Sequence, residues 1–254
     1  MNKAYVKKPL VFALCMFPIA VVGSILVSVY AYENYNEQTR ALMIQQLGSY
    51  RALLLMGAIQ GGMYGLFASF FGWILSDKVG LMRPFKFEKE KTIKVCLITV
   101  ACGILFALDA PVFGSIIPEV RASYTQGISP AGFFCSLLYG GIVEELFLRL
   151  FVMSLISWII WKVFARNKAR EDIPQWVFIT ANFIAAVLFA AGHIPATISL
   201  FGRLDFWILF RCFLVNGGLG LVFGRFYRKW GIQYAFIGHF GCHLVSKLLL
   251  VLLL

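Results

Sequence analysis

The sequence predicts an all-α, polytopic membrane protein with about seven transmembrane helices, and three observations lead to this fold class. Of its 254 residues, 60% are apolar and only 14% are charged, whereas a soluble domain is roughly 45–50% apolar and about 25% charged. The mean hydropathy is +0.81. The apolar residues gather in seven long stretches, and the segments between them are alternately rich and poor in Lys and Arg. Together these observations exclude a water-soluble globular domain.

Seven apolar stretches reach the length of about 20 residues that a helix needs to cross the hydrocarbon core of a bilayer. The first follows three lysines and resembles a signal peptide, but its apolar run exceeds the ~7–15 residues of a cleaved segment, so we expect a retained helix. The fourth, at ~1.5 Å per residue, is about 51 Å long and must tilt or project into the cytoplasm. The predicted spans are residues 9–30, 52–76, 95–117, 131–164, 174–198, 206–227 and 231–254.

The connections between the spans test this topology, because Lys and Arg collect on the cytoplasmic side of membrane proteins. The chain has 23 Lys and Arg against 12 Asp and Glu, a net charge of +11. If the N-terminus is cytoplasmic, 16 of these cations fall on the cytoplasmic side and four on the other, namely Arg40, Arg51, Arg121 and Arg203. We therefore predict a multi-pass protein of the cell membrane with a cytoplasmic N-terminus and a C-terminus on the opposite side. The basic balance then reflects topology in a lipid bilayer, and no nucleic-acid partner is expected.

We expect the chain to divide at residue 130. Residues 1–130 hold the first three spans and a basic cytoplasmic loop, and residues 131–254 hold the last four spans. Six cysteines are scattered without paired spacing, which supports neither a disulfide framework nor a CxxC metal site. A spacing that lets helices approach closely occurs in two glycine clusters, Gly61, Gly62, Gly65 and Gly217, Gly218, Gly220, Gly224.

A few ionisable residues remain inside the predicted spans, where each costs several kcal/mol unless it is paired or hydrated, so they are functional candidates. Asp109 can cap a break at Pro111, line a cavity, or pair with Arg211 or Lys247, and we favour the pairing. Lys247 can also extend its amine to the outer interface. The full set is Asp109, Glu144, Glu145, Arg149, Arg211, Lys247 and all three histidines, His193, His239 and His243.

Glu144 and Glu145 lie near the middle of the fourth span and cannot both be ionised cheaply in hydrocarbon. Arg149 follows Glu145 by four residues, the helical spacing at which a Glu and a following Arg meet. Glu145 is therefore expected to be ionised beside Arg149, while Glu144, turned by ~100°, faces a cavity as a general base. The alternative is that both acids only pair with Arg149 and fix the helix packing.

The three histidines supply partners for such a base. His239 and His243 share one face of the last span, and His193 ends the fifth span just before Pro195, a residue type that interrupts helices. Two chemistries remain open. His193, His239 and His243 together with Glu144 can bind zinc, which activates a bound water. Alternatively Glu144, oriented by His193, activates water directly while His239 and His243 stabilise the oxyanion.

Three ordered motifs on separate spans resemble those of the CPBP family, which groups CAAX prenyl-protein proteases with bacteriocin-processing and immunity proteins. The resemblance covers about residues 131–254 and implies an intramembrane endopeptidase with its catalytic core in the last four spans. The motifs are Glu144-Glu145-x-x-x-Arg149, Phe189-x-x-x-His193 and His239-x-x-x-His243.

The resemblance implies a role for each motif residue. Glu144 would activate water with His193 as its partner, His239 and His243 would stabilise the oxyanion, and Glu145 and Arg149 would support the site. One departure is His243, where the family often has Asn or Asp. A histidine there keeps a hydrogen-bond donor and adds a metal ligand.

This assignment sets a geometric condition. Along straight helices His193 would lie in the outer part of its span, His239 in the inner part and Glu144 near mid-depth, so the fifth helix must break at Pro195 or the sixth must tilt. The predicted function is hydrolysis of a peptide bond in a membrane-associated protein or peptide, of CAAX type or in a peptide precursor. The alternatives are a non-catalytic relative that binds a partner, as in bacteriocin immunity, and a transporter or haem carrier that uses the intramembrane Glu and His residues.

Overall fold

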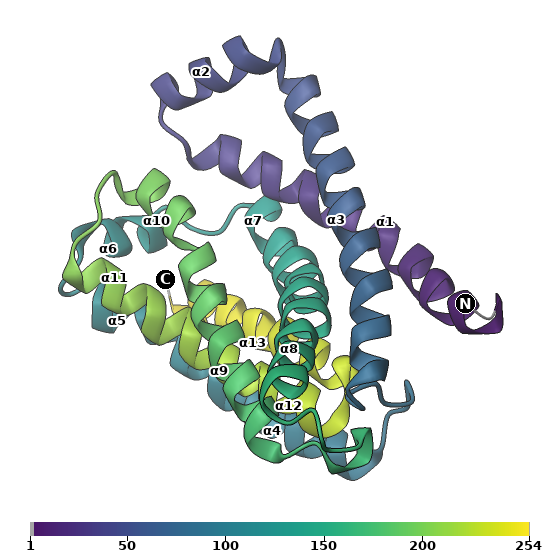
Figure 1. Ribbon diagram of the computed structural model, residues 1–254. Helices are drawn as coiled ribbons and strands as arrows, with labels where there is room; N and C mark the ends of the chain where they lie inside the picture. Colours follow the sequence, from purple (N-terminus) through teal and green to yellow (C-terminus); the bar gives the residue numbers. More distant parts are fainter. Residues whose placement is uncertain (1–2, 254) are drawn as a thin grey trace.

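The computed structural model describes residues 3–253, and within that range the chain forms helices and no strands (Figure 1). Seven segments of the described chain are long and apolar enough to cross a membrane, which confirms the predicted all-α, multi-pass fold class. Each lies within a few residues of a predicted span. The segments are Val6–Asn34, Tyr50–Lys78, Lys89–Phe113, Pro130–Phe164, Gln175–Phe201, Phe206–Trp230 and Ile232–Leu252.

The first two spans form a helical hairpin. Helix α1 (Lys3–Asn34) packs against α3 (Tyr50–Lys78), and the short α2 (Glu37–Leu47) joins them at one end of the molecule (Figure 1). The side chains of Asn36 and Ser49 cap α2 and α3 by accepting hydrogen bonds from backbone N–H groups. A Cβ on Gly61 would collide with Ser24, so this glycine cluster brings the two helices together as the sequence predicts.

The second glycine cluster is only partly an approach surface. A Cβ on Gly224 would collide with Asn182, and one on Gly220 would press against Arg149, so both glycines serve close packing. Gly218, in contrast, has no atom within 4 Å of the position of an added Cβ, and Gly217 has only ordinary contacts. The prediction is therefore wrong for Gly218, which no neighbour approaches, whereas Gly217 faces Ala186 and Ala190 of α9 at ordinary contact distance.

Two of the predicted spans are interrupted helices. The third consists of α4 (Lys89–Ala107) and α5 (Asp109–Phe113), followed by α6 (Pro118–Thr125), so the helix starts earlier than predicted and is interrupted at Leu108. The fifth consists of α9 (Gln175–Gly192) and α10 (Ile194–Phe201), with His193 at the junction. Pro195 lies in the first turn of α10, where its missing N–H costs no helical hydrogen bond.

The fourth span carries an irregularity that the sequence does not reveal. It begins as α7 (Pro130–Cys135) and ends as α8 (Ser154–Phe164), and between them two π-helical segments, η1 (Ser136–Val143) and η2 (Leu146–Met153), flank Glu144 and Glu145. π-Helical turns are rare and often mark functional sites. The sixth span contains another, η4 (Phe213–Gly217), between α11 (Phe206–Cys212) and α12 (Gly218–Trp230).

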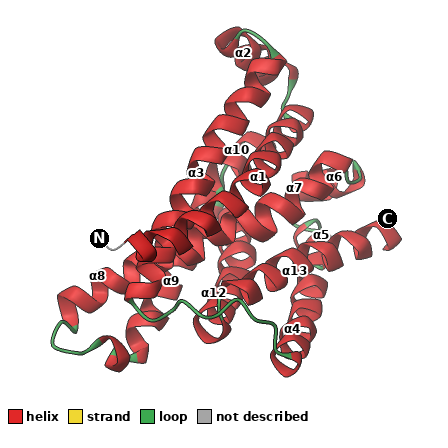
Figure 2. Cartoon of the chain, turned by 90° about the vertical axis from the view of Figure 1, so that its right-hand side faces the viewer, coloured by secondary structure: helices red, strands yellow, loops and turns green. Residues whose placement is uncertain are grey.

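The last helix, α13 (Ile232–Leu253), runs across the direction of α3, as Figures 1 and 2 show. It contacts α4, α12 and η1. The short η3 (Arg170–Asp172) completes the described elements. Because α13 crosses the bundle at a wide angle, residues at different distances along two spans can meet beside η1. The division of the chain at residue 130 falls at the first residue of α7 and stays a prediction.

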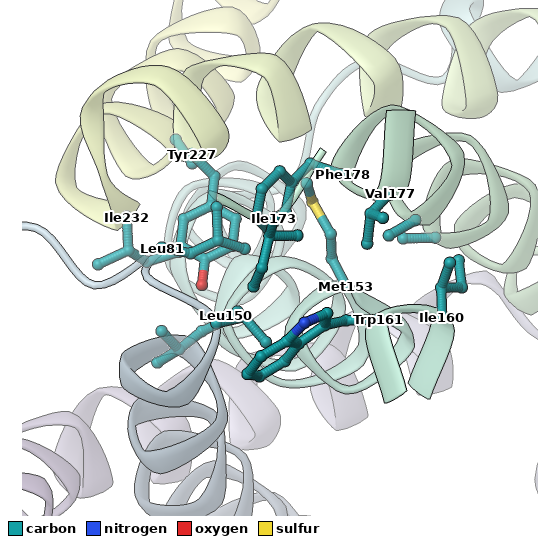
Figure 3. Packing of buried hydrophobic residues seen from close by; sticks show 14 of the residues in the cluster. Leu81, Leu150, Met153, Ile160, Trp161, Ile173, Val177, Phe178, Tyr227 and Ile232 are labelled. Carbon is teal, nitrogen blue, oxygen red and sulfur yellow. The ribbon is translucent and has the colours of Figure 1, made fainter. Parts of the chain in front are cut away.

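The largest apolar core fixes the fourth, fifth and sixth spans against one another (Figure 3). Leu150 and Met153 are fully buried there beside Val177 of α9 and Tyr227 of α12. The Tyr227 hydroxyl also donates a hydrogen bond of 2.7 Å to the Ser76 hydroxyl and accepts one of 2.7 Å from the Ser154 hydroxyl. This core lies directly after the Glu144–Glu145 pair in the fourth span and holds the pair in a fixed position.

Candidate active site

Glu144 and Glu145 lie between the two π-helical segments and have different surroundings. The Glu145 side chain is completely buried, whereas the Glu144 side chain is 19% exposed. Glu144 lines a cavity of about 740 Å³. The structure therefore places the two adjacent carboxylates as their spacing predicts, with Glu145 inside the protein and Glu144 facing the cavity.

Glu145 is the centre of a buried polar group that joins three spans. His239 Nδ1 donates a hydrogen bond of 2.8 Å to Glu145 Oε1, because a carboxylate can only accept. Arg149 Nη1 lies 3.2 Å from the same oxygen, and Arg149 Nη2 donates to the Gly220 carbonyl at 3.1 Å. A buried charge is tolerated only when it is paired in this way, so the predicted Glu145–Arg149 pair ties α12 and α13 to the fourth span.

Aromatic rings hold the histidines in place. The His239 ring stacks with Phe223 at a centroid distance of 4.5 Å and with His243 at 4.9 Å. Phe189 meets the His193 ring edge-on at 4.7 Å, and the Arg149 guanidinium lies 4.7 Å from the Phe189 centroid. Such contacts restrict ring rotation, so the imidazoles face Glu144 in defined orientations.

The helix break at Gly192–Ile194 positions His193. Its Nδ1 lies 2.8 Å from the Phe189 carbonyl, and since a carbonyl only accepts, Nδ1 carries the proton and Nε2 of the neutral ring has none. That Nε2 lies 3.9 Å from Glu144 Oε1. The sequence required a break in the fifth span or a tilt of the sixth for His193 to reach Glu144. The structure has such a break at His193, just before Pro195.

His239 completes the arrangement around Glu144. Because its Nδ1 is bonded to Glu145, its Nε2 is free, and this atom lies 3.9 Å from Glu144 Oε2. An ionised Glu144 and two neutral imidazole Nε2 atoms are all acceptors. Their separations exceed a direct hydrogen bond and match the span of a bridging water, which can donate to two of them. The cluster therefore suits a polarised water molecule beside a carboxylate.

The other predicted site residues occupy different positions. His243 lines the same cavity and stacks with His239, but the described residues show no contact between it and a carboxylate. Its Nδ1 is buried without a hydrogen-bond partner in residues 3–253, and its Nε2 packs so closely on Gly140 that a Cβ there would lie 2.8 Å away. Lys247, one turn further along α13, has no hydrogen bond or ion pair with any described residue.

The donor types of the predicted zinc ligands suit zinc, and the bonds from the Nδ1 atoms of His193 and His239 resemble those of metal-bound histidines. As placed, however, the described residues include no group of three or more His, Cys, Asp or Glu side chains that could hold a metal ion. The arrangement therefore does not form a metal centre, and we derive no catalytic step through one.

Asp109 pairs with Arg211, as the sequence favours. Arg211 Nε donates to Asp109 at 2.8 Å and its Nη2 donates to the second oxygen, which also accepts from Tyr124 at 2.7 Å. Burial, followed by the nearby Asp109 carboxylate, raises the pKa of Tyr124, so Tyr124 remains a hydrogen-bond donor at neutral pH. This group joins α5, α6 and α11 and does not contact Glu144.

Sequence reasoning misses several parts of the site. Phe223 and the Gly220 carbonyl hold His239 and Arg149, yet an aromatic residue and a backbone oxygen in an apolar span carry no chemical signal of their own. Phe189 belongs to the second motif, but its contact with Arg149 is not visible in the motif spacing. Tyr30 and Tyr64 of the first two spans line the cavity, which the resemblance of the last four spans could not indicate.

Comparison with known proteins places this geometry in a family. Residues 126–245 match the family model described as "Type II CAAX prenyl endopeptidase Rce1-like". No curated protein and no solved structure matches the chain. The matched region contains Glu144, His193, His239 and His243 together with their buried partners. Residues 126–245 are therefore an Rce1-like domain of the CPBP and CAAX protease family, and this domain indicates a membrane protease.

Proposed function

We propose that Glu144 is the general base that activates water for hydrolysis of a peptide bond in a membrane-associated protein or peptide. The observation that carries this proposal is the position of Glu144 in the cavity, with the Nε2 atoms of His193 and His239 each 3.9 Å from one of its oxygens. A carboxylate in a poorly hydrated site is a suitable general base near neutral pH.

Water and the residues of this chain are enough to balance the chemistry. Glu144 accepts a proton from water as the water oxygen attacks the carbonyl carbon of the substrate and forms a tetrahedral intermediate. The proton passes to Nε2 of His193, which gives it to the leaving amine as the C–N bond breaks. His243, whose neutral ring carries one N–H, donates a hydrogen bond to the oxyanion. His239 donates a second from Nε2 after taking up a proton from solvent water as substrate binds, and it returns this proton to water when the product leaves, so that no net proton is consumed. A fixed donor at the oxyanion is worth about 3–4 kcal/mol.

Glu145 and Arg149 act as positioning residues in this proposal. The 2.8 Å bond from His239 Nδ1 to Glu145 orients the imidazole so that Nε2 faces Glu144. Arg149 neutralises the buried carboxylate and holds it beside α12 through the Gly220 carbonyl. The pair thereby preorganises the site without contacting the substrate.

The substrate class follows from the family and from the cavity. We propose a peptide segment of CAAX type or of a peptide precursor that enters from the membrane or its surface. The lining of the cavity is mostly apolar and aromatic, with Glu144 the only Asp, Glu, Lys or Arg among the described lining residues. Such a lining favours an apolar segment around the cleaved bond.

The decisive experiment compares membrane-associated peptides from cells that express the wild-type chain or Glu144→Gln. We expect the Glu144→Gln cells to lose specific cleavage products and to accumulate their precursors. Glu171→Gln, an exposed acidic position in η3 far along the chain from the site, is the matched control and should behave as wild type. An unchanged peptide profile in Glu144→Gln cells at equal expression would contradict the proteolytic role.

Two further measurements separate the alternatives. If Glu144→Gln retains the biological role of the protein, as a partner-binding or bacteriocin-immunity protein would, the binding function is favoured. Metal analysis of the purified protein and of its His193→Ala and His243→Ala variants tests zinc. Stoichiometric zinc that is lost in both variants would replace the metal-independent mechanism with metal-assisted hydrolysis.

A further inference from the structure

A second cavity lies at the end of the third and seventh spans, and it shares no described lining residue with the cavity around Glu144. Its volume is about 780 Å³, within the range of about 300–1,000 Å³ for sites that bind small ligands. The walls come from the end of α4, from α5 and α6, and from the end of α13, which lie together in Figures 1 and 2. The cavity is therefore separate from the proposed active site and large enough to hold a ligand.

The interruption of the third span borders this space. The cavity lies between the residues around Leu108, where α4 ends and α5 begins, and Leu249 and Leu250 at the end of α13. Ile104 and Leu108 on its wall are 45% and 46% exposed. The cavity is thus open at the side of the bundle, where lipid acyl chains surround a membrane protein.

The polar part of the lining is concentrated on α6. Arg121, Tyr124 and Thr125 all line the cavity, and their spacing of three and four residues places them on one face of this helix. The wall formed by α4, α5 and α13 is apolar. The cavity therefore matches a ligand with a polar end and an apolar chain.

Arg121 gives the polar wall a positive charge that the protein does not neutralise. It is the only Asp, Glu, Lys or Arg among the described lining residues. Its side chain is exposed and has no hydrogen bond or ion pair with any described residue. Glu119 of the same helix is paired with Arg203, and the Asp109 carboxylate of α5 is paired with Arg211. The Arg121 guanidinium is therefore free to bind an anion, and a phosphate can accept two parallel hydrogen bonds from it.

From these observations we infer that the cavity binds one phospholipid, with an acyl chain along the apolar wall and the phosphate on Arg121. Lipid headgroups lie at the ends of membrane spans, and the cavity lies at the end of two spans, Lys89–Phe113 and Ile232–Leu252. Basic pockets between transmembrane helices bind anionic headgroups. Phosphatidylglycerol should bind more tightly than phosphatidylcholine, because choline carries a cation that Arg121 repels. This inference does not depend on the proposed role of Glu144.

Native mass spectrometry of the delipidated full-length protein in detergent tests this site. The wild-type protein should bind one phosphatidylglycerol at a lower concentration than it binds phosphatidylcholine. Arg121→Gln should weaken binding of phosphatidylglycerol by about tenfold, as expected for the loss of a charged hydrogen bond, and should remove the preference between the two lipids. Arg51→Gln is the matched control, since Arg51 is an exposed cation at the start of α3 that lines neither cavity. Equal affinities of Arg121→Gln and the wild type for phosphatidylglycerol would overturn the inference.

Filling the cavity tests its apolar part. Ala110→Trp and Thr125→Trp each add a large ring to the wall, and two positions guard against a variant that fails to fold. Each folded variant should lose the phosphatidylglycerol site, whereas Glu144→Gln should keep it. Inorganic phosphate at the same concentration should not compete, because it has no acyl chain. The inference is wrong if both folded tryptophan variants keep the site, or if phosphate displaces the lipid. It is also wrong if the lipid-free wild type forms a dimer that the tryptophan variants cannot form, because a second copy of the chain would then fill the cavity.

Discussion

Asp109 and Glu144 are both carboxylates within the apolar part of this chain, and their surroundings differ. Asp109 is buried, and its two oxygens accept three hydrogen bonds from Arg211 and Tyr124. Glu144 has two imidazole nitrogens at 3.9 Å and no direct hydrogen bond to a described residue. Both oxygens of Asp109 therefore accept hydrogen bonds from the protein. The oxygens of Glu144 instead face the cavity, which His193 and His239 also line.

This difference separates a structural charge from a chemical one. A buried carboxylate whose oxygens are bonded within the protein is not available to water or substrate, so it does not take part directly in the chemistry. A carboxylate that faces a cavity beside two histidines keeps its lone pairs available for a proton. Glu145 is also held inside the protein, although it is the neighbour of Glu144 in the sequence. Its Oε1 is bonded to His239 and paired with Arg149, and its buried Oε2 has no hydrogen-bond partner among the described residues.

The largest expected effect on folding comes from Arg149→Met. It leaves Glu145 buried without a counter-ion, so we expect a loss of about 3–5 kcal/mol in the free energy of unfolding and a loss of activity. Thermal unfolding of the purified protein in detergent measures the loss of stability, and the release of peptide products measures the loss of activity. The double variant Glu145→Gln with Arg149→Met should regain much of the stability and stay impaired, because His239 has lost its carboxylate. Full activity in the double variant would contradict the positioning role.

Breaking the other buried pair should affect stability alone. Arg211→Met removes the partner of Asp109, and because Arg211 is partly exposed we expect a loss near the lower end of the same range, about 3 kcal/mol. Activity per folded molecule should stay within about twofold of wild type, a small change on the scale of general acid–base effects. A loss of activity as large as that of Glu144→Gln, without unfolding, would show that the Asp109 group belongs to the active site.

A smaller effect is expected from Gly140→Ala, which changes only the contact with His243. The added Cβ would lie 2.8 Å from His243 Nε2, and overpacking of this kind costs about 1–3 kcal/mol. We expect a displaced imidazole and reduced activity. Gly218→Ala is the matched control, since nothing lies within 4 Å of its added Cβ, and it should be neutral or slightly stabilising. Equal activities of the two alanine variants would argue against a role for the position of His243.

The smallest effect concerns the exposed ion pair of Glu119 and Arg203, which belongs neither to the Asp109 group nor to the active site. A hydrogen bond from Arg203 lowers the pKa of Glu119, so the pair stabilises the protein above the ordinary pKa of a glutamate and this contribution is lost as the pH falls through the lowered value. Glu119→Gln should therefore unfold slightly earlier than wild type at pH 7, with the difference fading below about pH 4. A difference that grows on acidification would contradict this assignment.

The sequence by itself determined the fold class and the candidates. Apolar runs of membrane-spanning length define the spans because a bilayer demands them, and the cost of charge in hydrocarbon singles out Glu144, Glu145, Arg149 and the histidines. The spacing of Glu145 and Arg149 also predicts their pairing, because that contact lies within one helical turn. These features are local or compositional, and each can be derived without knowledge of neighbouring spans.

Only the tertiary structure decided which candidates meet. His239 lies 94 residues after Glu145, and their bond depends on the wide crossing of α13, which no local pattern encodes. Packing between spans likewise decides the π-helical turns around Glu144 and the helix break at His193. It also decides the contacts of Phe189 with His193 and of Phe223 with His239.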